Sequence, residues 1–213
     1  MNYHAVITGD IVDSRKVAQR EELLGELKSA LNMIARNFHA RYEIFRGDSF
    51  QAEVPDTRDA MLAAILLRAH LRAVTPSSKP LWDVRASVGV GRRASGQQAL
   101  GEAGGEAFEL SGLGLEKTAG SDTRLSVWTP SARINEELAL PTRFADDIIS
   151  NWSHYSAEIA YYQLLLKESQ SELGKLLGKK QPTIHARLTT AKIKLIEAYI
   201  DRVGALFARE FGE

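Results

Sequence analysis

Hydrophobic and polar positions follow two different periods over residues 1–130. Short runs of β-branched and apolar residues predict strands at residues 3–8, 41–45, 50–54, 84–90 and 125–128. Apolar residues three and four positions apart predict helices at residues 14–38, 57–74 and 106–117. In chain order these elements give β-α-β-β-α-β-α-β. This order is typical of a ferredoxin-like α/β sandwich, an α+β fold with its helices on one face of one sheet.

The pattern changes after Pro130, where the strand signals end. Every segment from Ile134 to the end of the chain has helical periodicity, including a long terminal helix with its own apolar stripe. We therefore predict two domains, an α/β domain at residues 1–130 and an all-helical region at residues 131–213.

The helical region contains a short helix, a turn and a second helix at about residues 170–194. The first helix starts with a serine, which commonly caps a helix, and stops at Gly178, which tolerates a left-handed backbone. Pro182 lies in the first turn of the second helix, where its missing N–H is not needed. Position 174 requires a small residue, here Gly174, because the second helix crosses the first at this point. We expect the buried face of the second helix to consist of Ile184 and Leu188.

This segment resembles the helix-turn-helix of sigma factor region four, in which a turn glycine precedes a valine or isoleucine and an arginine-leucine pair. The matching residues here are Gly178, Ile184, Arg187 and Leu188. The resemblance implies DNA binding in which the major groove or the phosphates are contacted by Gln181, Thr183, His185 and Arg187, and the DNA backbone by Lys179 and Lys180. The alternative is an ordinary helical hairpin whose lysines form a solvated face.

Only one segment of the chain has the surplus of basic residues expected for binding an anionic partner. The 27 basic and 27 acidic residues of the chain cancel, which argues against a protein that coats nucleic acid generally. Between Gln170 and Lys194, however, Glu172 is the only acid among six basic residues, namely Lys175, Lys179, Lys180, Arg187, Lys192 and Lys194. This surplus strengthens the prediction of a DNA-binding segment.

Composition excludes several other classes. The chain has no cysteine, so disulfides, thiolate zinc sites and cysteine nucleophiles are excluded. No apolar run approaches the roughly 20 residues of a bilayer span, and the N-terminus lacks the pattern of a secretory signal. We therefore expect no membrane partner and a cytoplasmic location. The five histidines show no metal-ligand spacing, and no serine nucleophile motif is present.

The end of the first strand carries a second candidate site. Asp10 offers a hard oxygen ligand there, and the helix that starts near Ser14 directs N–H groups at an anion. Asp48 lies in the predicted hairpin turn of residues 46–49, next to the first strand in such a sheet, so the two carboxylates can share Mg²⁺. We assign Asp10, Ile11 and Asp48 to the metal site, and Ser14, Arg15 and Arg46 to a nucleotide or phosphate site. The alternative is that these are plain turn and helix-cap residues.

These residues resemble class III nucleotide cyclases, whose first strand ends in Asp-Ile-x-Gly-Ser and whose hairpin carries Gly-Asp. The matches are Asp10, Ile11, Ser14, Gly47 and Asp48. A cyclase-like domain followed by a helix-turn-helix resembles the SatD family, which is associated with bacterial secretion and acid tolerance. That resemblance implies a cyclase-type sandwich that assembles in pairs.

Three departures from the cyclase pattern predict a degenerate domain. Asp13 replaces the phosphate-loop glycine and places a negative charge beside a triphosphate. Glu109 and Leu113 stand where cyclases have an asparagine and the arginine that stabilises the transition state. We therefore predict a homodimeric DNA-binding transcriptional regulator whose α/β domain senses Mg²⁺ or a nucleotide. The alternatives are a nucleotide cyclase or related two-metal phosphoryl-transfer enzyme, and a protein-interaction module.

Overall fold

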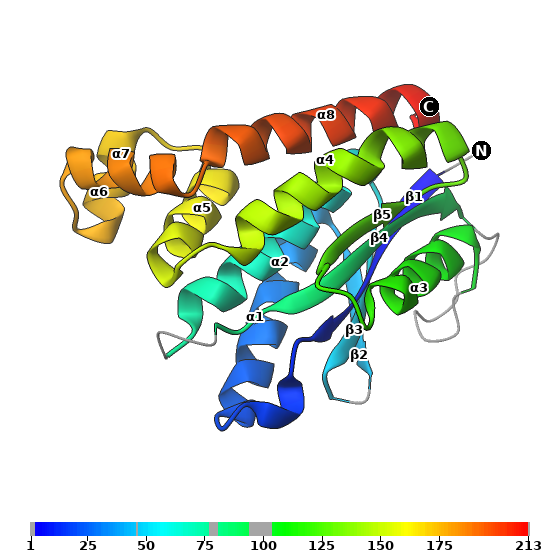
Figure 1. The fold of residues 1–213 in the computed structure, drawn as a ribbon, viewed down its shortest axis with the longest axis horizontal. Coiled ribbons are helices and arrows are strands. Elements are labelled where there is room, and N and C mark those ends of the chain that lie inside the picture. Colours follow the sequence, from blue (N-terminus) through cyan, green and yellow to red (C-terminus); the bar gives the residue numbers. More distant parts are fainter. Residues whose placement is uncertain (1–2, 46, 77–80, 94–103, 213) are drawn as a thin grey trace.

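Figure 1 shows the computed structural model, which describes residues 3–45, 47–76, 81–93 and 104–212. The strands are β1 (Tyr3–Ile11), β2 (Arg41–Phe45), β3 (Ser49–Val54), β4 (Val84–Arg92) and β5 (Leu125–Trp128). They form one sheet in the order β2-β3-β1-β4-β5, in which only the β4–β5 pair is parallel. The first four strands therefore have the ferredoxin-like arrangement, and the predicted mixed α/β fold is confirmed.

Helices cover both faces of this sheet. Ala5 and Ile7 of β1 belong to the main hydrophobic core, which includes α1 (Arg20–Phe38) and α2 (Ala60–Val74). Val6, which points the opposite way, packs instead against α3 (Glu106–Thr118). The prediction that all helices lie on one face is therefore wrong for α3. A parallel β4–β5 pair needs a crossover helix, and the free face of the sheet receives it.

Two short 3-10 turns precede the first two long helices. The helix expected from Ser14 is a 3-10 turn at Ser14–Lys16, and α1 begins only at Arg20. A second 3-10 turn at Thr57–Asp59 leads into α2. The first turn follows Asp13, whose φ of 53° lies in the left-handed region, so the chain bends sharply where β1 ends.

The remaining helices form one side of the molecule (Figure 1). They are α4 (Ala132–Ser150), α5 (His154–Leu166), α6 (Gln170–Leu177), α7 (Gln181–Thr190) and α8 (Ile193–Phe211). Helix α4 packs on β5 and α8, and α5 packs on α2. One hydrophobic core therefore extends from Ala5 to Phe211, across the predicted boundary at residue 130. That boundary stays a prediction.

No helix in the described residues is both long enough and apolar enough to cross a membrane. The cytoplasmic location stays a prediction.

Helix α3 lies unusually close to the sheet because glycines of β4 face it. A Cβ atom on Gly89 would lie 2.3 Å from the Ala107 carbonyl oxygen and 2.5 Å from the Ser111 backbone nitrogen. On Gly91 it would lie 2.3 Å from the Ala107 backbone nitrogen. Since these neighbours are backbone atoms, neither position accepts a side chain unless the helix moves.

We predict that Gly89→Ala lowers the free energy of unfolding by about 2 kcal/mol or more, because the methyl group forces α3 away from β4. Gly112→Ala on α3 is the control, since no atom lies within 4 Å of its added Cβ. It should raise stability by about 0.5–1 kcal/mol. Urea unfolding of both variants measures the difference, and equal stabilities would contradict the close packing of α3.

Candidate functional site

The structure brings Asp10 and Asp48 to the same end of the sheet, as the sequence predicts. Asp10 lies opposite Ser49 in the β1–β3 register. The backbone N–H of Ile11 donates to the Asp48 carbonyl oxygen at 3.0 Å, which ties the hairpin turn to the end of β1. The side chain of Ile11 itself is buried in the core.

Asp10 is held by an arginine that sequence reasoning missed. Arg85 stands opposite it in the β1–β4 register. The Arg85 Nε and Nη2 atoms donate to the two oxygens of Asp10 at 2.9 and 2.8 Å. This hydrogen bonding raises the pKa of Arg85 above its ordinary value. Both oxygens of the predicted metal ligand therefore already have a cationic partner.

Asp48 also has a partner within the site. The Ser14 hydroxyl donates to Asp48 Oδ2 at 2.5 Å, and Ser14 is buried. This bond joins the 3-10 turn after β1 to the β2–β3 hairpin. Arg15 is exposed beside this bond. Arg46, the third residue predicted to bind phosphate, lies outside the described residues.

These residues do not fit a magnesium ion as they stand. Magnesium prefers octahedral coordination by oxygens, several of them from water. Asp10 is neutralised by Arg85, and Asp48 already accepts a hydrogen bond. Within the described ranges, no group of three or more histidine, cysteine, aspartate or glutamate side chains is placed to hold a metal.

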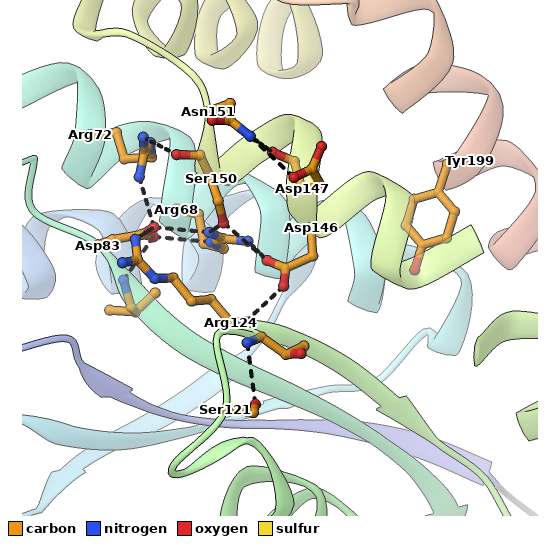
Figure 2. A network of polar contacts seen from close by, with 12 residues as sticks. Arg68, Arg72, Asp83, Ser121, Arg124, Asp146, Asp147, Ser150, Asn151 and Tyr199 are labelled. Carbon is orange, nitrogen blue, oxygen red and sulfur yellow. Dashed lines mark hydrogen bonds and ion pairs between the residues drawn. The ribbon is translucent and has the colours of Figure 1, made fainter. Parts of the chain in front are cut away.

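A buried ionic network lies beside this site, and its centre is Asp83 (Figure 2). Asp83 precedes β4 and has no exposed side-chain surface. Its Oδ2 atom accepts hydrogen bonds at 2.9 Å from each of three arginines, Arg68, Arg72 and Arg124. Its backbone carbonyl also accepts from the Val12 N–H at 3.0 Å, so the network touches the end of β1.

Asp146 of α4 completes the network. Its Oδ1 accepts from Arg68 Nη1 at 2.6 Å, and its Oδ2 accepts from the Arg124 backbone N–H at 2.8 Å. Three guanidinium groups thus face two carboxylates, and these five residues come from α2, α4 and the segments just before β4 and β5 (Figure 2). Such a network holds together only when every member is placed correctly, because an unpaired buried charge costs several kcal/mol.

The pKa of Asp83 reflects two opposing effects, its burial and the positive charges of the surrounding arginines. Burial alone raises the pKa of Asp83, but the charge and hydrogen bonds of Arg68, then the charges of Arg72 and Arg124, outweigh it and hold the pKa at about 2. Asp83 is therefore ionised in the folded protein at any pH near neutrality.

The predicted helix-turn-helix segment is a compact hairpin of α6 and α7. Gly178 ends α6 with a φ of 61°, as expected for a left-handed stop. A Cβ on Gly174 would lie 2.8 Å from the Lys179 carbonyl oxygen, so a small residue is required there. Ile184 and Leu188 are buried, as predicted. The helix starts earlier than expected, because the capping residue is Ser169, which forms a reciprocal capping box with Glu172.

The hairpin exposes most of the residues assigned to DNA. Lys179, Lys180, Gln181, Thr183 and His185 are all exposed at the turn and the first half of α7.

Arg187 is the exception, because it faces α5. Its Nη1 atom donates to Glu158 at 2.7 Å, and its guanidinium lies 4.4 Å from the centre of the Tyr155 ring. The expected outward position of Arg187 is therefore wrong. Its ion pair and cation–π contact fix α7 on α5.

No protein-family model matches the chain, and no curated protein matches it. Among solved structures, it is similar to the active GGEEF domain of a diguanylate cyclase from Vibrio cholerae, with 14% identity and a TM-score of 0.45 over 62% of this chain and 85% of that chain. It is also similar to a bacterial light-regulated adenylyl cyclase, with 19% identity and a TM-score of 0.36 over 59% of this chain and 75% of that chain. Membership of the SatD family stays a prediction.

We predict that Asp83→Asn lowers the free energy of unfolding by about 3–5 kcal/mol at pH 7, since it leaves buried guanidinium charges uncompensated. The folded pKa of Asp83, about 2, lies below that of an unfolded aspartate, so its stabilisation is complete above the unfolded pKa and is lost as the pH falls toward 2. The variant should therefore lose stability less steeply than the parent over that range. Denaturant unfolding as a function of pH measures both effects.

The control is Asp56→Asn, because Asp56 forms a partly exposed pair with Arg58. It should cost at most about 1 kcal/mol. If both variants lost a similar free energy of unfolding, the buried Asp83 network would contribute no more to stability than a partly exposed ion pair.

Proposed function

We propose that this chain is a DNA-binding transcriptional regulator in which the α6–α7 hairpin contacts duplex DNA. The observation that carries the proposal is the exposure of Gln181, Thr183 and His185 on the first half of α7, beside Lys179 and Lys180 in the turn. Polar side chains at the start of a second helix, next to unburied cations, match the chemistry of a helix that enters the major groove.

Each group has a distinct role in this proposal. Lys179 and Lys180 neutralise phosphates and position the hairpin on the duplex. Gln181 carries both a donor and an acceptor, which suits it to reading an adenine edge, and Thr183 and His185 lie farther along the helix. Arg187 holds α7 in place through Glu158 and does not contact DNA.

A single hairpin reads few base pairs, so we propose that two copies bind two related half-sites as a homodimer. Half-sites separated by one helical turn of DNA, or by a multiple of it, would then match the two-fold symmetry of the protein. A nucleotide bound at Ser14 and Arg15 remains a proposed signal for the α/β part. The phosphoryl-transfer alternative is less favoured, because Arg85 occupies both oxygens of Asp10.

Selection of genomic DNA fragments by the purified 213-residue chain would identify a target duplex. Fluorescence anisotropy on that duplex at several salt concentrations then tests the hairpin. We expect Lys179→Met with Lys180→Met to weaken binding to all sequences and to reduce the salt slope by about two per protomer, because two phosphate contacts are lost. Gln181→Ala should weaken binding by about 1–3 kcal/mol and relax the preference at one base position.

The matched control is Lys16→Met with Lys28→Met, which removes two exposed lysines of the α/β part. It should leave the salt slope unchanged. The proposal fails if no fragment is selected, or if the double variants at the hairpin and at the control positions have the same affinity and the same salt slope.

A further inference from the structure

A cleft lies at the edge of the sheet, next to the Arg124 segment of the buried ionic network. It has a volume of about 220 Å³ and is formed by β5, the end of α3, the loop that joins them and the first half of α4. Its lining comprises Lys117, Thr118, Ser121, Thr123, Leu125, Ser126, Val127, Trp128, Asn135, Ala139, Thr142 and Arg143. Since β5 is the last strand of the sheet, no neighbouring strand of this sheet fills the space beside it.

The charge of this cleft is one-sided. Lys117 and Arg143 are the two basic residues of its lining, and both are exposed. No aspartate or glutamate is among the described residues that line this cleft. Neither cation forms an ion pair with any acid in the part of the chain that the structure describes. Elsewhere the arginines of this fold are mostly matched by carboxylates, as around Asp83 and Asp10.

The walls of the cleft combine an apolar strip with hydroxyl and amide groups. On the β5 side the apolar lining consists of the partly exposed Trp128 and of Leu125 and Val127, which are buried in the main core. The Lys117 ammonium lies 3.8 Å from the centre of the Trp128 ring, and this cation–π contact holds the charge over the cleft. The buried Ser126 hydroxyl has no hydrogen-bond partner within the described ranges. A few polar groups converging on an apolar floor are the usual composition of a small-molecule site.

We propose that this cleft binds a small organic anion. Its carboxylate or phosphate lies between Lys117 and Arg143, and its apolar part packs on the β5 side chains. The volume of about 220 Å³ lies below the roughly 300–1,000 Å³ of sites for drug-sized ligands, so the ligand is small. An inorganic ion would leave the partly exposed Trp128 uncovered, whereas a neutral molecule would leave both cations without an anionic partner. The proposal is independent of DNA binding.

Benzoate, benzamide and inorganic phosphate are suitable probes for this cleft. Benzoate has both the charge and the apolar ring, benzamide keeps the shape without the charge, and phosphate keeps the charge without the ring. The three tryptophans of the chain give three indole N–H signals in the spectrum of the ¹⁵N-labelled protein. Trp128→Phe assigns the signal of Trp128, and the signals of the buried Trp82 and Trp152 are internal references.

We expect benzoate to shift the Trp128 signal saturably below about 10 mM, and to bind roughly tenfold more tightly than benzamide or phosphate. Lys117→Met and Arg143→Met should each weaken benzoate binding roughly tenfold, because each removes one charge-assisted contact. Lys28→Met, an exposed lysine on α1, is the control and should have no effect. Unchanged signals of Trp82 and Trp152 would show that each variant is folded.

Three results with benzoate would overturn the proposal. They are the absence of a saturable shift with benzoate, equal affinity for benzoate and benzamide, and an unchanged affinity in either cation variant. Preference for phosphate over benzoate would also overturn it, since the cleft would then select the charge alone.

Discussion

The carboxylate of Asp83 is the constraint on which the rest of this structure depends. It accepts hydrogen bonds from arginines of α2 and from Arg124 before β5, while Arg68 reaches on to Asp146 of α4. Removing these charges from water is unfavourable unless every partner is present. The network therefore specifies where α2, α4 and the starts of β4 and β5 meet, and it explains how a helical region is fixed on an α/β sheet.

The same network reaches the α6–α7 hairpin through a tryptophan. Arg72, bound to Asp83, also donates to the Trp152 carbonyl oxygen at 2.7 Å. The indole N–H of Trp152 donates in turn to the carbonyl oxygen of Ala191, at the end of α7, at 2.9 Å. Four residues before Ala191, Arg187 of α7 is paired with Glu158 of α5. These contacts fix the second half of α7, whereas Gln181, Thr183 and His185 in its first half stay exposed.

Local patterns predicted most of this architecture. The strands and long helices follow from periodicity, and the hairpin follows from Gly174, Gly178 and Pro182, whose backbone requirements are met within a few residues. The features of the fold and the sites that the sequence did not predict arise from contacts between segments that are distant in the chain. The face that α3 covers follows from the β4–β5 crossover, and the bond from Arg85 to Asp10 follows from the β1–β4 register. Likewise, Arg187 and Glu158 meet only because α5 and α7 pack together. Periodicity along the chain contains none of this information.

The candidate sites at the end of β1 and at the β5 edge differ in whether the protein itself pairs their charged groups. At the end of β1, both carboxylates expected to bind a metal are engaged with another part of the protein, Asp10 with Arg85 and Asp48 with Ser14. Such groups stabilise the fold, and a ligand would have to displace a partner before it gained a contact. At the β5 edge, Lys117 and Arg143 carry charge that no acid lining their cleft offsets. A site in which the protein leaves its own charges unmatched is better prepared for an anion than one that the fold has already neutralised.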